Sequence, residues 1–76
     1  MGPPVGEVKV VTKTRGDLVY VDGGYAGVTG KLKSFPLREG KHTIQLRDSS
    51  GHTVYSESVY VIAGKTAKVY ADSSAG

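Results

Sequence analysis

Few side chains in this sequence could do chemistry, and no set of them has the spacing of a catalytic site. Nucleophilic catalysis needs a base within reach of the nucleophile, and glycoside hydrolysis needs two carboxylates across a cleft. The serines stand in predicted turns or at outward strand positions without such partners. Asp22, Glu39 and Asp48 also lie at turns, where carboxylates accept hydrogen bonds from backbone amides. We therefore expect no catalytic residue and no enzyme activity.

The sequence offers little for a metal or a cofactor. It has no cysteine, and its two histidines, His42 and His52, cannot close a zinc site on their own. His42 has the inward parity of its predicted strand, so we expect a half-buried packing residue. The segment GGYAGVTGK (23–31) resembles a phosphate-binding loop, but Leu32 stands where a Ser or Thr would hold magnesium. No helix is predicted after it, so its glycines are interpreted as turn residues, and no metal or cofactor is expected.

The tyrosines are the best candidates for binding. Tyr20, Tyr60 and Tyr70 have the outward parity of their predicted strands, and Tyr25 lies in a predicted hairpin. Tyrosine combines a flat apolar ring with a hydroxyl group, which suits sugar rings and protein partners, and an exposed row of rings could also stack bases. The alternative is that strands favour tyrosine for cross-strand packing whatever the function.

The elements that must position these residues are strands. Helical periodicity is absent, and apolar residues recur at every second position between turn sequences such as DGG (22–24) and DSSG (48–51). Because side chains on a strand alternate between two faces, each segment has one face to bury. The predicted strands cover residues 7–12, 17–22, 41–47, 56–62 and 66–72.

This spacing predicts an all-β fold: a small antiparallel β-sandwich, immunoglobulin-like or carbohydrate-binding-like, with about six or seven short strands. Pro36 lacks an amide hydrogen and cannot sit in a central strand. Residues 25–40 are therefore expected to cross between the sheets with one or two edge strands, from which Phe35 and Leu37 reach the core. Lys31 and Lys33 would discourage edge-to-edge pairing.

The overall charge is mildly positive. Ten basic and seven acidic residues give a net charge of +3 over 76 residues, and the basic positions are spread along the whole chain. A nucleic-acid-binding protein usually gathers its positive charge on one face, so no nucleic acid is expected as partner. No apolar run approaches the roughly 18 residues of a membrane helix, so this segment is not expected to insert directly into a membrane.

The motifs taken together resemble the PEGA domain family. They are VYVDG (19–23), LxxGKHTI (37–44) and AGKT (63–66), which occur in the order and spacing of that family over about residues 6–72. The namesake Pro-Glu-Gly-Ala corresponds here to Thr14-Arg15-Gly16-Asp17, which keeps only the glycine. The resemblance implies a small β-sandwich in a bacterial or archaeal surface or envelope protein, and it implies no common catalytic residues.

Residues 15–17 also spell the integrin-recognition tripeptide Arg-Gly-Asp. Gly16 matches a turn glycine of the PEGA pattern, so the structural interpretation is favoured and adhesion stays an alternative.

These observations lead to the following expectations. Residues 1–5 are a linker, residues 6–72 the domain and residues 73–76 a flexible tail. The domain is a non-enzymatic, extracytoplasmic spacer or protein-interaction module of a larger protein, with protein partners or self-association through edge strands. The alternative is a carbohydrate-binding module that uses Tyr20, Tyr60 and Tyr70 on one sheet, with Tyr25 nearby, to bind a glycan.

Overall fold

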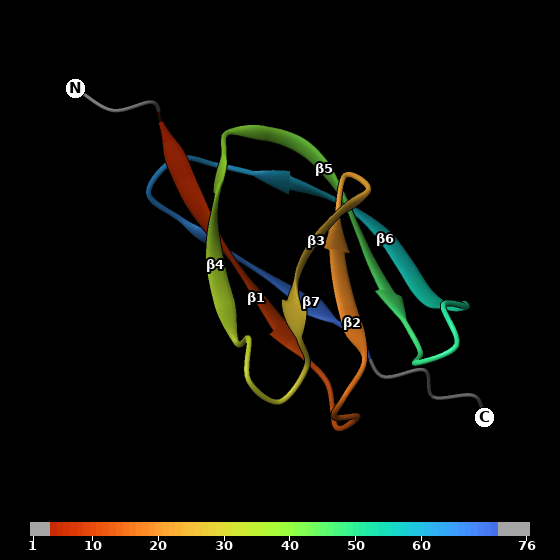
Figure 1. Ribbon diagram of the computed structural model, residues 1–76. Coiled ribbons are helices and arrows are strands. Elements are labelled where there is room, and N and C mark those ends of the chain that lie inside the picture. The colour runs from red at the N-terminus through yellow and green to blue at the C-terminus, as the bar shows by residue number, and fades with distance from the viewer. Residues whose placement is uncertain (1–3, 72–76) are drawn as a thin grey trace.

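Seven strands in two layers make up the protein (Figure 1). The computed structural model describes residues 4–71. No helix occurs among these residues, in agreement with the all-β prediction. The strands are β1 (Val5–Val11), β2 (Leu18–Val21), β3 (Gly24–Val28), β4 (Ser34–Arg38), β5 (Gly40–Arg47), β6 (Thr53–Val61) and β7 (Thr66–Tyr70). The predicted domain start is one residue later than the first residue of β1. The predicted tail and the last residue of the predicted strand 66–72 lie outside the described residues.

The strands form a three-stranded sheet with the order β4-β1-β7 and a four-stranded sheet with the order β3-β2-β5-β6. The chain passes between the sheets four times, after β1, β3, β4 and β6. The prediction for residues 25–40 is confirmed, because β3 and β4 are edge strands of different sheets. Pro36 lies in β4, where its missing amide hydrogen removes no bond from a central strand.

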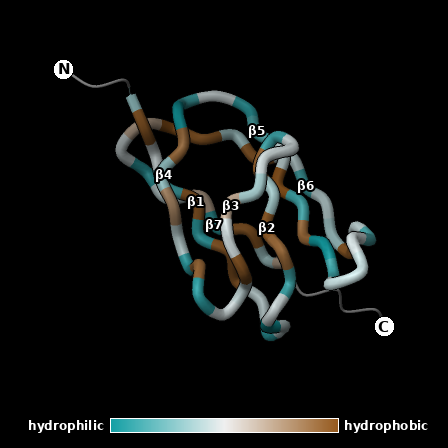
Figure 2. Tube along the Cα trace, in the orientation of Figure 1, coloured by the Kyte–Doolittle hydropathy of each residue, from teal (hydrophilic) through white to brown (hydrophobic). Residues whose placement is uncertain are grey.

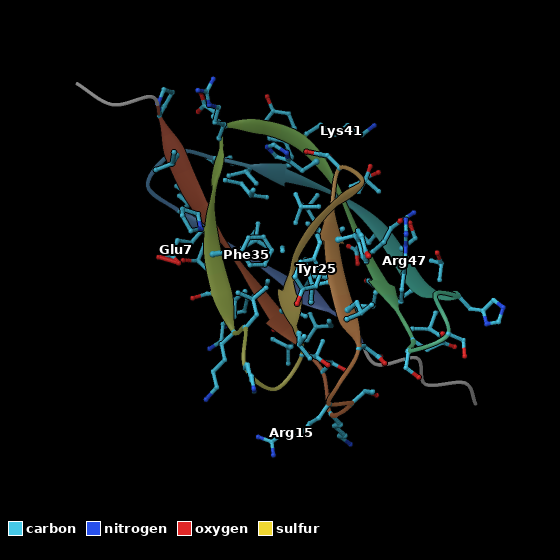
Figure 3. The ribbon with its side chains drawn as sticks, in the orientation of Figure 1. Glu7, Arg15, Tyr25, Phe35, Lys41 and Arg47 are labelled. Atoms are coloured by element: carbon cyan, nitrogen blue, oxygen red, sulfur yellow. The ribbon has the colours of Figure 1, made fainter. Side chains whose placement is uncertain are left out.

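The core lies between the two sheets and consists of alternate residues of five strands. Figure 2 shows the hydrophobic residues alternating with polar ones along the strands. The buried hydrophobic residues are Val8, Val10, Val19, Ile44, Leu46, Val59, Val61, Val69 and Ala71. Phe35 and Leu37 pack against this cluster from β4, as predicted, and Figure 3 shows the Phe35 ring directed between the layers. The predicted period-two pattern is thus confirmed.

The hairpin between β2 and β3 has the tight turn that its Asp-Gly sequence predicts. Asp22 has a φ of 50° and Gly23 a φ of 86°, and Val21 pairs with Gly24 across the turn. Positive φ at both central positions defines a type I′ turn, whose twist matches that of the flanking strands. The ladder shifts register between Val19 and Tyr20, so β3 contains one extra residue.

One pair of strands differs from the purely antiparallel prediction. The first and last strands, β1 and β7, run parallel, with Glu7 paired to Thr66 and Val11 to Tyr70. The reason is topological: after β6 the chain crosses back to the three-stranded sheet, and β7 enters it beside β1 from the same end. Alternation along a strand does not report the direction of its neighbour, so the pattern could not reveal this pair.

The chain's two isoleucines provide a matched test of the core. Ile44 is fully buried, whereas Ile62 is 49% exposed. We expect Ile44→Val to lower the free energy of unfolding by about 0.5–1.5 kcal/mol, because it removes a buried methyl group. Ile62→Val should change it by less than about 0.5 kcal/mol. Urea denaturation followed by circular dichroism measures both, and equal effects would contradict the two-layer packing.

Candidate functional site

Two of the four candidate tyrosines lie together on the outer face of the four-stranded sheet. Tyr20 of β2 and Tyr25 of β3 are paired in the ladder, and their ring centroids are 5.9 Å apart with an interplanar angle of 66°. The guanidinium carbon of Arg47, on β5, lies 4.0 Å from the centroid of the Tyr20 ring. Because a guanidinium over a ring face is a favourable cation–π contact, this small cluster packs three strands together from outside.

The other two candidates lie elsewhere. Tyr60 is on the edge strand β6, opposite Lys41 of β5, and Tyr70 is on β7 in the other sheet. The prediction that Tyr20, Tyr60 and Tyr70 share one sheet is therefore wrong. The physical reason is that the chain crosses between the layers after β6, which an outward parity on each strand does not reveal. Tyr25, Tyr60 and Tyr70 are each more than 60% exposed, as their predicted positions require.

The tyrosine cluster does not present one flat surface. The rings of Tyr20 and Tyr25 meet edge to face, and Arg47 covers a face of Tyr20. The Arg47 side chain also donates a hydrogen bond from Nη2 to Gln45 Oε1 at 3.1 Å, which holds the guanidinium in place. Binding of a sugar ring by stacking would thus fall to single exposed tyrosines, and their binding role stays a prediction.

A second cluster joins His42 to residues from two turns, and the sequence analysis did not identify it. His42 Nδ1 lies 2.6 Å from Asp22 Oδ2, and His42 Nε2 lies 2.7 Å from the carbonyl oxygen of Arg38. Asp22 Oδ1 also accepts the backbone amide of Thr43 at 2.8 Å. His42 belongs to the four-stranded sheet and Arg38 to the three-stranded sheet. The histidine therefore connects the two layers at one end of the sandwich.

This geometry favours the charged form of His42. Both of its ring nitrogens face acceptors, a carboxylate oxygen and a carbonyl oxygen, so both nitrogens must carry protons to satisfy them. The hydrogen bond to Asp22, followed by that to the Arg38 carbonyl, raises the pKa of His42 above its ordinary value of 6.5. The hydrogen bond from His42, followed by that from the Thr43 amide, lowers the pKa of Asp22 below 3.8. The contact between Asp22 and His42 thus favours the ionised form of both side chains.

The Asp22–His42 pair resembles part of a catalytic triad, but its surroundings differ. In a triad the second ring nitrogen faces a hydroxyl or thiol nucleophile. Here that nitrogen faces the carbonyl oxygen of Arg38, which accepts a hydrogen bond and has no proton to give to the histidine. The His42 side chain is only 16% exposed, and the half-buried packing position predicted for it is confirmed. What the pair can do is hold the β2–β3 turn, β5 and the end of β4 together.

The other predicted turn carboxylates also accept backbone amides, as expected. Asp48 Oδ1 accepts the amides of Ser50 at 2.9 Å and His52 at 3.0 Å, and these bonds lower the pKa of Asp48, with His52 contributing most. Glu39 Oε2 accepts the amide of Ala63 at 3.4 Å. Among residues 4–71, no group of three or more His, Asp or Glu side chains is arranged to hold a metal ion.

The end of the sandwich away from His42 carries a hollow of about 270 Å³ and an adjoining one of about 350 Å³. They lie between the β1–β2 connection and the β3–β4 connection and share Arg15, Thr29 and Gly30. Figure 3 shows Arg15 at this end of the molecule, far from Lys41 at the other. Five of the chain's basic residues line the two hollows, namely Lys9, Lys13, Arg15, Lys31 and Lys33. The fold thus brings together half of the basic residues that are dispersed along the sequence. Dispersed charge is therefore no longer a reason to expect no nucleic-acid partner.

A two-layer β-sandwich whose turn carboxylates accept backbone amides defines a small all-β module. The model of the PEGA domain family matches residues 5–73, nearly the whole chain, and the chain belongs to that family. The resemblance inferred from the motifs is confirmed. No curated protein and no solved structure matches the chain. Membership is consistent with an extracytoplasmic module, and the described part of the chain has no helix long and apolar enough to span a bilayer.

The Asp22–His42 pair predicts a specific pH dependence of stability. Because the folded-state pKa of His42 is raised, its contribution is complete below pH 6.5 and is lost as the pH rises through the folded-state value. Because the folded-state pKa of Asp22 is lowered, its contribution is present above pH 3.8 and is lost as the pH falls through the folded-state value. Stability from this pair is therefore greatest between pH 3.8 and 6.5.

Asp22→Asn tests this dependence, because asparagine tolerates the positive φ and still accepts the Thr43 amide. We expect it to lower the pKa of His42 and to reduce the free energy of unfolding at pH 5 by about 1 kcal/mol, since Asp22 is half exposed. Histidine ring NMR and urea denaturation of freshly purified protein measure the two effects. Asp48→Asn is the control and should leave the titration of His42 unchanged. An unchanged pKa in Asp22→Asn would refute the charged pair.

Proposed function

We propose that this chain is a non-enzymatic, in-line spacer module of a larger surface or envelope protein. The observation that supports the proposal is the parallel pairing of the first and last strands. Because β1 and β7 point in the same direction, a chain that enters at the start of β1 leaves at the opposite end of the sandwich (Figure 1). The domain measures 41 × 22 × 20 Å, so it is elongated. Such a module adds length to a polypeptide instead of folding it back.

The same pairing would make the module resist tension. A pull that is applied before β1 and after β7 draws the two strands past each other, so it acts on all of their hydrogen bonds at once. The ladder has five residue pairs from Glu7–Thr66 to Val11–Tyr70. Backbone bonds extend it at both ends, from the Glu7 amide to the Lys65 carbonyl and from the Ala71 amide to the Val11 carbonyl, each at 2.9 Å. A surface spacer under mechanical stress needs this kind of shear geometry.

Single-molecule force measurements test the spacer proposal. We expect a higher unfolding force when the domain is pulled from Pro4 and from a point after residue 71 than when it is pulled from Pro4 and Lys65. The second pair of points lies at one end of β1 and β7, so it peels their hydrogen bonds apart one at a time. The chain has no native cysteine, so introduced thiols give unique attachment points. Equal forces in the two geometries would contradict a role in bearing tension.

For the same module we infer a second role, in which the edge of β6 binds an extended segment of a neighbouring polypeptide. β6 has nine residues and, within the described residues, one strand partner, β5. Its sequence TVYSESVYV contains no Gly, Pro, Lys or Arg, and Val54 and Tyr60 are exposed. The other edges are protected in familiar ways. β3 contains glycines and a bulge, β4 contains Pro36, and β7 carries Lys68.

The charge of β6 favours a different polypeptide over a second copy of this one. Glu57 is the middle residue of β6 and its only charged residue. Antiparallel pairing of two β6 strands over their full length would therefore place two Glu57 side chains opposite each other, and like charges opposite each other are destabilising. A partner strand with a basic residue at that position would instead be attracted. The preferred occupant is thus an extended, weakly basic segment with alternating apolar residues.

An NMR titration with a peptide of the β5 sequence, residues 40–47, tests the edge role, since this basic strand already pairs with β6. We expect saturable shifts in the amides of residues 53–61. Ser56→Lys together with Ser58→Lys should weaken them, because lysine blocks edge pairing. Ser49→Lys together with Ser50→Lys, in the neighbouring turn, adds the same charge and is the control. Equal weakening by both double variants, or unmoved β6 amides, would exclude edge binding.

A further inference from the structure

The two adjoining hollows that share Arg15, Thr29 and Gly30, named here the basic cleft, have a lining of one charge sign. Lys9, Lys13, Arg15, Lys31 and Lys33 contribute half of the ten basic residues of the chain. No acidic residue is among the described residues that line either hollow. Such a surface concentrates anions by its field alone. From the sequence these cations are separated by up to 24 positions, and only the approach of two connections brings them together.

The positive charge extends from the cleft onto the outer face of the three-stranded sheet. Lys9 of β1 stands directly opposite Lys68 of β7 in the parallel ladder. Lys33 lies beside β1 as well, because its carbonyl accepts the Val10 amide at 3.0 Å. Like charges opposite each other on neighbouring strands destabilise a sheet. Glu7 lies on the same face two positions along β1, and a bound anion would add to its attraction for these cations.

The backbone of the basic cleft is rigidly connected. Thr29 is 2% exposed and joins the two connections by three hydrogen bonds. Its carbonyl accepts the Gly16 amide at 3.0 Å, its amide donates to the Asp17 carbonyl at 2.8 Å, and its hydroxyl accepts the Asp17 amide at 2.9 Å. These bonds hold both walls of the cleft in register. Preorganised walls lower the entropic cost of binding a ligand.

The exposed Arg15 side chain lies beside Gly30. Gly30 has a φ of 96°, and a Cβ built there would lie 3.2 Å from Arg15 Nε and 3.4 Å from Arg15 Cγ. The glycine thus leaves the space in which the arginine side chain lies. A guanidinium can bind a carboxylate or a phosphate through two parallel hydrogen bonds. Arg15 is therefore the best placed residue of the cleft to orient an acidic group.

We propose that the basic cleft binds the acidic groups of an anionic polysaccharide. The lining selects this class among polyanions. It contains no aromatic residue, so the base stacking that supports binding of single-stranded nucleic acid is not available there. Val11 and Leu32, both half-buried, supply apolar surface, and Thr12 supplies a hydroxyl group beside the cations. Anionic polysaccharides carry apolar ring faces, hydroxyl groups and repeated carboxylate or phosphate groups. They therefore match a lining that combines cations with apolar and polar surface.

Binding of polygalacturonate to the whole chain tests the proposal, with neutral dextran, a twenty-nucleotide oligothymidylate and polyglutamate as comparison probes. We expect polygalacturonate to shift the amides of residues 12–17 and 29–33, and its affinity to fall as salt rises. Dextran should not bind. Tighter binding of the oligothymidylate or of polyglutamate than of polygalacturonate would overturn the assignment to polysaccharides.

A matched pair of charge variants separates the cleft from net charge. Lys31→Gln with Lys33→Gln removes two cations from the cleft, and Lys41→Gln with Lys65→Gln removes two from the other end. We expect the first to weaken polygalacturonate binding by about tenfold, because it removes two cations that would pair with acidic groups of the polymer. The second should weaken binding by less than about twofold. Lys41 and Lys65 lie at the other end of the domain, and salt screens their attraction for a ligand in the basic cleft. Equal weakening by both double variants would overturn the site.

Discussion

The burial of one row of side chains from each sheet is the constraint on which the rest of this structure depends. Because it has no cysteine, the 76-residue chain has no disulfides, and its stability comes from a core of mostly valine side chains and from its strand ladders. Valine suits this core because its branched side chain packs well on a pleated surface and has few rotamers to lose. Once the inner faces are occupied in this way, function is left to the outer faces, the edges and the two ends.

The two ends of the sandwich are built from opposite electrostatic arrangements. At one end, Asp22 and His42 form a hydrogen-bonded pair that connects the layers through the Arg38 carbonyl. At the other end, the connections around Thr29 bring cations together without an acidic residue in the cleft lining. The first arrangement pairs groups that attract each other, whereas the second places cations near one another. The two ends of this elongated module therefore differ: one carries the Asp22–His42 pair and the other carries the basic cleft.

The direction of the strands relates the fold to the proposed roles. The parallel β1–β7 pair sends the chain through the module from end to end, and β7 leaves the outer edge of β6 uncovered in the other layer. Spacing and edge binding are thus compatible, because a chain under tension loads β1 and β7 while β6 stays free for a neighbour. The basic cleft lies between the β1–β2 and β3–β4 connections and includes the end of β1, so it is separate from the edge of β6.

The sequence by itself determined the class of fold, the inward residues and the turn carboxylates. Alternation of valines, the Asp22-Gly23 turn and Pro36 each act locally: a strand has a period of two, a type I′ turn needs positive φ, and proline cannot donate to a ladder. The motifs that indicated the family also consist of such strand and turn residues, so they could be recognised without the tertiary structure.

Only the tertiary structure decided which residues meet. Parity shows which way Tyr20, Tyr60 and Tyr70 point, but not that Tyr70 joins the other sheet. His42 and Asp22 are 20 positions apart, and their contact depends on strand order together with the position of the Arg38 carbonyl. The basic cleft likewise depends on two connections meeting at Thr29. Strand order, strand direction and the meeting of loops are set by packing over the whole chain, and such long-range contacts leave no periodic signal in one sequence.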